Sequence, residues 1–95
     1  MAGMDRPDLY VIARILDGLW HANGPMLRTH LQVASNVNYD IFSRYLEWMQ
    51  GKGLVSVEDA SDGHVRVALT AQGAEAYRKV VQWINEVVRG RAPGA

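Results

Sequence analysis

The sequence contains no cysteine, and this absence removes several kinds of chemistry at once. Without thiols the chain forms no disulfide framework, no thiolate zinc site and no cysteine nucleophile. A reducing compartment suits such a chain, and we expect it to act in the cytoplasm. We also expect no metal and no cofactor, because His21, His30 and His64 fall in different elements without the spacing of metal ligands.

Long apolar runs are missing as well. Charged residues interrupt every apolar stretch, so the sequence predicts no helix that spans a membrane. No basic leader is followed by an apolar run, so we expect no signal peptide. No glycine-rich phosphate loop is present, because the glycines around Lys52 lack the surrounding pattern, and no paired carboxylates stand beside a base. We therefore expect neither an enzyme nor a small-molecule substrate.

An excess of charge of one sign is the third missing feature. Ten lysines and arginines balance ten aspartates and glutamates, so no long-range field attracts nucleic-acid phosphate. The case for a nucleic-acid partner must therefore come from local architecture. The chain has 95 residues, 48% of them apolar, which fits one small domain. A core of that size is marginal, and self-association would supply further buried surface.

Apolar residues of helical period occupy the first half of the chain. They predict a first helix over residues 8–22 and a third helix over residues 39–50. A shorter second helix lies between them, with Leu27, Leu31 and Ala34 on its apolar face. The second and third helices are separated by a polar turn of only a few residues, which is typical of a helix-turn-helix.

The periodicity changes to two after the third helix. Residues 54–58 and 64–69 read as two strands, and the Asp62-Gly63 pair between them suits a hairpin turn. Thr70 is then expected to cap a final helix that reaches Val88 and spans roughly 27 Å.

The order of these elements predicts a mainly α fold with a small β-hairpin wing. Helix, helix, tight turn, helix, hairpin and helix is the order of a winged helix-turn-helix. We expect a frayed leader at residues 1–7, the winged helix-turn-helix at 8–69, a long C-terminal dimerisation helix at 70–89 and a disordered tail at 90–95.

Three segments resemble a known family. They are VNYDIFSRYLE at residues 37–47, GKGLV at 51–55 and LTAQG at 69–73, and they resemble the small archaeal winged-helix DNA-binding proteins of about ten kilodaltons. The resemblance covers roughly residues 9–88. It implies DNA binding, as a transcription factor or an abundant chromatin-like protein, and a C-terminal helix that forms an antiparallel coiled coil between two subunits.

The chain departs from this family in two respects. Family members commonly carry more lysine, and their last helix is often longer. The segment from residue 26 to residue 69 contains four basic residues (Arg28, Arg44, Lys52, Arg66) and five acidic ones (Asp40, Glu47, Glu58, Asp59, Asp62). Phosphate contacts supply most non-specific affinity for DNA. We therefore expect a site-selective transcriptional regulator rather than a coat on bulk DNA.

Nine polar residues are candidates for contact with double-stranded DNA, on the third helix, the second helix and the wing: Arg28, His30, Asn38, Tyr39, Ser43, Arg44, Lys52, His64 and Arg66. Each also has a simpler interpretation. The guanidinium of Arg44 either bonds to guanine or phosphate, or pairs within its helix with Asp40 or Glu47.

The simpler interpretations of the other candidates are structural. Asn38 is either a DNA contact or only a helix cap. Lys52 either touches phosphate or favours the negative end of the third helix. The remaining candidates are equally consistent with solvated surfaces.

The final helix carries more apolar surface than one small domain needs. We expect Tyr77, Val81, Ile84 and Val88 to form a seam with a second copy of the chain; the alternative is that this helix folds back onto the first. An alternative for the whole protein is a winged-helix protein-interaction or scaffold module that does not bind DNA, as the neutral charge and the acidic wing tip would allow.

Overall fold

The computed structural model describes residues 7–88. The elements follow in the order α1 (Leu9–Ala22), β1 (Met26–Leu27), α2 (Arg28–Ser35), α3 (Tyr39–Gly51), β2 (Val55–Asp59), β3 (Val65–Leu69) and α4 (Ala71–Trp83), which continues as a π-helical segment (Ile84–Val88). The predicted leader, apart from Pro7, and the predicted tail lie outside the described residues. The mainly helical fold with a small wing is confirmed.

Polar side chains begin three of the helices as the sequence predicts. The carboxylate of Asp8 accepts a hydrogen bond from the N–H of Tyr10, and the side chain of Asn38 accepts one from the N–H of Ile41. The hydroxyl of Thr70 caps α4 in the same way. These bonds satisfy amide groups that lack a partner inside the helix.

The sheet has one strand more than the sequence predicts. Its order is β1-β3-β2, all antiparallel, and β1 places Met26 opposite Val67 and Leu27 opposite Arg66. The predicted hairpin is confirmed as β2 paired with β3, whereas the third strand was missed, and Leu27, predicted on the face of a helix, lies in β1 instead. Two residues are too few to show the alternation that marks a strand, so nothing local identifies β1.

The core forms where α1 crosses the other elements. Ile15 and Leu16 of α1 are fully buried, together with Leu31 of α2, Phe42 of α3 and Val67 of β3. These side chains form one hydrophobic cluster, in which α1 packs on α2 and α3 packs on β2. Within residues 7–88 no helix is both long and apolar enough to cross a membrane.

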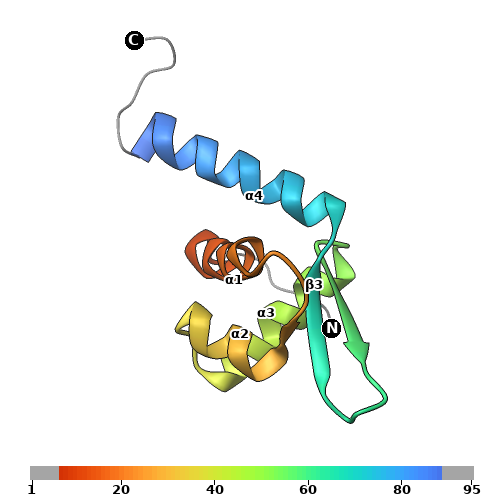
Figure 1. The fold of residues 1–95 in the computed structure, drawn as a ribbon. Coiled ribbons are helices and arrows are strands. Elements are labelled where there is room, and N and C mark those ends of the chain that lie inside the picture. The colour runs from red at the N-terminus through yellow and green to blue at the C-terminus, as the bar shows by residue number, and fades with distance from the viewer. Residues whose placement is uncertain (1–6, 89–95) are drawn as a thin grey trace.

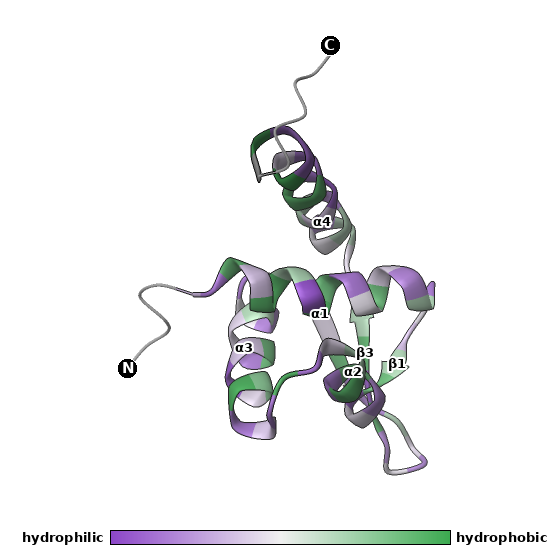
Figure 2. Ribbon diagram, turned by 90° about the vertical axis from the view of Figure 1, so that its left-hand side faces the viewer, coloured by the Kyte–Doolittle hydropathy of each residue, from purple (hydrophilic) through white to green (hydrophobic). Residues whose placement is uncertain are grey.

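The hairpin and the last helix extend from this core in different directions. Figure 1 shows the tip of the β2–β3 hairpin and the far end of α4 at opposite ends of the molecule. Figure 2 shows that α4 leads away from the body and carries hydrophobic segments out to its far end. The molecule thus presents two separate surfaces, one on α2, α3 and the wing and the other on α4.

Candidate nucleic-acid interface

The helix α3 is held by its buried face and exposes the opposite one. Phe42, Leu46 and Met49 are buried. At 100° per residue, Arg44 and Glu47 lie about half a turn away from that buried stripe, and both are exposed. Whatever docks against α3 therefore meets these polar side chains first.

Three predicted contact residues lie together where α2 meets α3. The Nη2 of Arg28 donates a hydrogen bond of 2.7 Å to the Oγ of Ser43, and its guanidinium lies 5.3 Å from the centre of the Tyr39 ring and 5.5 Å from that of Phe42. Such contacts hold the cation without neutralising it. Arg28 is half-buried, so its head group is fixed in place before any partner arrives.

Arg44 differs from Arg28 because it is exposed and free. Within residues 7–88 it forms no ion pair with Asp40 or Glu47, although both are within helical reach. The alternative of an intrahelical ion pair is thus not seen. The guanidinium keeps all its hydrogen-bond donors available at the outer face of α3.

The other predicted contacts near α3 have varied surroundings. Asn38 caps α3 through its side-chain oxygen, 2.9 Å from the N–H of Ile41. Lys52 follows the helix, with its ammonium 5.7 Å from the centre of the Trp48 ring. His30 is exposed on α2. Asn38 therefore serves as a cap whatever else it touches.

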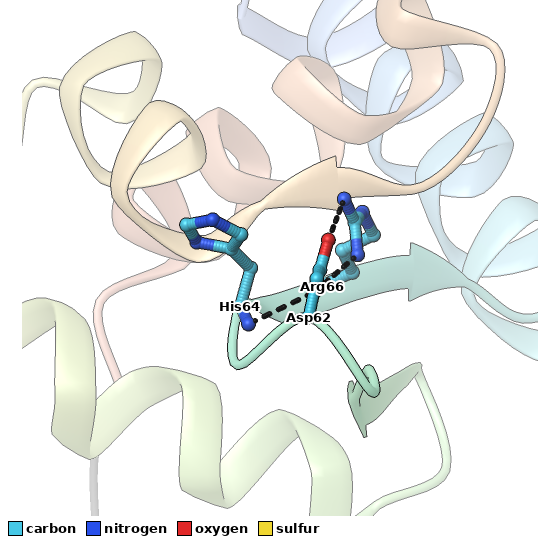
Figure 3. A network of polar contacts seen from close by, with 3 residues as sticks. All are labelled: Asp62, His64 and Arg66. Atoms are coloured by element: carbon cyan, nitrogen blue, oxygen red, sulfur yellow. Dashed lines mark hydrogen bonds and ion pairs between the residues drawn. The ribbon is translucent and has the colours of Figure 1, made fainter.

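The wing contains an ion pair that sequence reasoning missed. The carboxylate of Asp62 accepts hydrogen bonds from the guanidinium of Arg66, at 3.1 and 3.4 Å, and from the backbone N–H of His64, at 3.0 Å (Figure 3). The hydrogen bond from Arg66 holds the pKa of Asp62 below its usual value. Because this pKa is lowered, the pair is complete at neutral pH and is lost only as the pH falls through the lowered value.

This ion pair changes what the wing offers to a partner. Arg66 is tied to its own chain, whereas the ring of His64 stays exposed. The sequence shows an acidic residue at the hairpin tip and a basic residue on the following strand. Whether Asp62 and Arg66 form an ion pair depends on the register of the hairpin. Exposed pairs of this kind contribute little to stability, so a competing anion can displace Asp62 at small cost.

The first half of α4 packs on α1 of its own chain. The hydroxyl of Tyr77 donates a hydrogen bond of 2.6 Å to Asp17, and its ring lies 4.9 Å from that of Trp20. The guanidinium of Arg78 also lies over the ring of Trp20, 5.8 Å from the ring centre. Tyr77, one of the predicted seam residues, therefore fixes the direction in which α4 leaves the body.

The second half of α4 and the π-helical segment that continues it have apolar side chains in solvent. Trp83 is 46% exposed and Val87 57% exposed, while Val81 is exposed and Ile84 half-buried. A groove of about 620 Å³ runs beside Val81, between α4 and Trp20. The side chain of Val88 lies outside the described part of the chain.

Replacing Tyr77 by phenylalanine tests the link between α4 and α1. The ring stack remains while the hydrogen bond to Asp17 is lost, so we expect the free energy of unfolding to fall by about 1 kcal/mol. Burial and this hydrogen bond raise the pKa of Tyr77 to about 12 from 10.0. The advantage of the wild type is then greatest below pH 10 and disappears as the pH rises through about 12. Urea titrations of both proteins from pH 7 to 12 measure it, and a constant difference over that range would contradict the assignment.

The family of this chain follows from its match to a protein-family model. Residues 6–87 match the family model described as winged helix-turn-helix. The chain is a member of the winged helix-turn-helix family. The comparison with curated proteins gives no match.

Solved structures of other winged helix-turn-helix proteins superimpose on the chain. A MarR-family transcriptional regulator from Silicibacter pomeroyi matches with a TM-score of 0.72 and 25% identity, over 88% of this chain and 60% of that one. Sso10a-2, a DNA-binding protein from Sulfolobus solfataricus, matches with 0.73 and 16%, over 90% of this chain and 83% of that one. The winged-helix DNA-binding protein F93 from STIV matches with 0.73 and 17%, over 87% and 94%. At these low identities the similarity establishes the fold.

Proposed function

We propose that the protein is a homodimeric transcriptional regulator that binds double-stranded DNA and reads the major groove with α3. The observation that carries this proposal is the outer face of α3, where an exposed Arg44 has no ion-pair partner within residues 7–88. Buried residues on the other side hold the helix rigidly. A rigid helix with a free guanidinium at its outer face suits direct recognition of guanine.

Residues around α3 would position the duplex through its phosphates. Arg28 is already fixed by Ser43 and Tyr39, and Lys52 stands just beyond the helix. On the wing, His64 is exposed, and Arg66 becomes available once phosphate competes with Asp62. Such contacts fix the register of the protein on DNA without reading sequence. The structural neighbours described as DNA-binding proteins support the same function.

A second copy of the chain is the partner we propose for α4. Val81 and Trp83 are exposed on its far half, and Val87 is exposed on the π-helical segment that follows, with the half-buried Ile84 between them. In a monomer this apolar surface stays in water, and pairing two such helices removes it. Two linked copies would also place two α3 helices on one duplex, which strengthens a weak individual footprint.

Arg44→Ala tests the DNA contact. We expect the affinity for duplex DNA to fall by about tenfold or more, the loss of one good contact to a base or phosphate. Arg14→Ala is the matched control, since Arg14 is an exposed arginine on α1. Fluorescence anisotropy with labelled duplexes at several salt concentrations measures both.

Two results would separate this proposal from its alternative. Equal affinity of the two variants would remove α3 from the DNA interface. Absence of binding by the wild type to any duplex at low salt would favour the alternative of a protein-interaction module. The balanced charge of the chain is consistent with that alternative.

A further inference from the structure

The outermost line of α3 carries a carboxylate as well as a guanidinium. Arg44 and Glu47 are three residues apart and therefore neighbours on the helix surface. Both are exposed, and within residues 7–88 neither is paired with the other. Asp40 lies one turn before Arg44 on the same line, but it is also in the first turn of the helix, where a carboxylate stabilises the helix N-terminus. Glu47 has no such helix-stabilising position.

A carboxylate at this position is costly for general DNA binding. When α3 docks on DNA, the carboxylate of Glu47 approaches phosphates, which repel it. The region between residues 26 and 69 already holds more acidic than basic residues. Non-specific affinity depends on cations that neutralise phosphates. Glu47 therefore lowers affinity for every duplex unless a base offers it a hydrogen bond.

The base edges of the major groove differ in whether they can give such a bond. An ionised carboxylate only accepts hydrogen bonds. Cytosine presents an N4 amino donor and no acceptor, adenine presents its N6 amino group beside the acceptor N7, and guanine and thymine present acceptors. In the duplex the cytosine amino group has one acceptor beside it, O6 of the paired guanine, whereas the adenine amino group lies between two, its own N7 and O4 of the paired thymine. Cytosine therefore satisfies the carboxylate with the least repulsion.

We infer that Glu47 determines specificity by accepting a hydrogen bond from the N4 amino group of a cytosine, beside a guanine read by Arg44. This inference rests on the proposed function and names the duplex that α3 selects. Arg44 supplies attraction to the guanine edge, and Glu47 penalises every duplex without a cytosine at the neighbouring position. An interface poor in positive charge then gains discrimination at the cost of overall affinity.

Glu47→Gln is the substitution that tests the inference, because it keeps the shape and removes the charge. An amide both donates and accepts, and pairs best with the N6 and N7 of adenine. The wild type and the variant are each used to select from duplexes of randomised sequence. Glu75→Gln is the matched control: it makes the same chemical change on an exposed residue of α4, where Glu75 lies near Arg78 and Lys79.

We expect the wild type and Glu75→Gln to select a guanine with a cytosine beside it. Glu47→Gln should lose the cytosine preference by about tenfold and move towards adenine at that position, while its affinity for unselected duplexes rises. Identical selected sequences for all three proteins, with unchanged affinity for unselected DNA, would overturn the role of Glu47 and leave DNA binding standing. Failure of all three to select any duplex would instead overturn the proposed function, and the inference with it.

Discussion

Replacing Gly73 by alanine is expected to lower the free energy of unfolding by about 3 kcal/mol, the cost of forcing an extra methyl group into a packed site. A β-carbon at this position would overlap the carbonyl oxygen of Leu54 and lie 2.9 Å from Cδ1 of Leu69. The Leu54 carbonyl cannot easily withdraw, because it accepts hydrogen bonds from the N–H of Thr70 at 3.2 Å and from its hydroxyl at 3.0 Å. The first turn of α4 therefore packs directly against the backbone of Leu54, the residue before β2.

Gly51→Ala is the matched control for this substitution. Gly51 is the last residue of α3, and a β-carbon there would meet nothing within 4 Å. Alanine is a better helix former than glycine by about 1 kcal/mol, so this variant should be as stable as the wild type or slightly more stable. Urea denaturation of the three proteins measures the difference. If both alanine variants unfold at the wild-type midpoint, the close approach at Gly73 is not as the structure has it.

Replacing Ile84 by glutamate is expected to convert the proposed dimer into monomers. The change puts a carboxylate where α4 passes into the π-helical segment, between the exposed Val81 and Val87, and burying an unpaired charge costs several kcal/mol. The dissociation constant of the dimer should rise by about a hundredfold or more. DNA affinity should fall with it, because one subunit reaches only one half-site.

Gln82→Glu controls for the added charge. At 100° per residue Gln82 lies about 160° around the helix axis from Ile84, and its side chain is exposed. Analytical ultracentrifugation of the wild type and both variants measures the mass of each species. Dimers for the wild type and Gln82→Glu, and monomers for Ile84→Glu, are expected. A monomeric wild type would refute the proposed dimer directly.

Sequence reasoning succeeded where the causes of structure are local. The caps at Asp8, Asn38 and Thr70 bind amides two or three residues away, so the residue types alone predict where α1, α3 and α4 begin. The apolar period of α3 likewise predicts which of its faces is buried. These local signals, in order, are enough to predict a winged helix-turn-helix.

Features that depend on distant parts of the chain escaped prediction. Strand β1 exists because Met26 pairs with Val67, far along the chain. Tyr77 meets Asp17 across sixty residues, which turns a predicted seam residue into the anchor of α4 on α1. The end of α4 becomes π-helical at Ile84, so the α-helical spacing behind the predicted seam does not continue to Val88.

The candidate interface was predicted as a set of residues but not as an arrangement. The sequence indicates Arg28, Arg44 and Arg66 as three similar cations. The structure shows one fixed by Ser43 and an aromatic ring, one free, and one bound to Asp62. Those differences follow from how α2 meets α3 and from the register of the hairpin, and neither is encoded in local pattern.

Selection of the wild-type protein against duplexes of randomised sequence, at low salt, tests the central claim most directly. A homodimer that reads the major groove with α3 should enrich a palindromic pair of half-sites spaced by about one turn of DNA, roughly 10 base pairs, or a multiple of it. Arg44→Ala should lose that enrichment. Sequences that remain random after repeated rounds would contradict the account, and a selected motif that Arg44→Ala enriches equally well would contradict the role of α3.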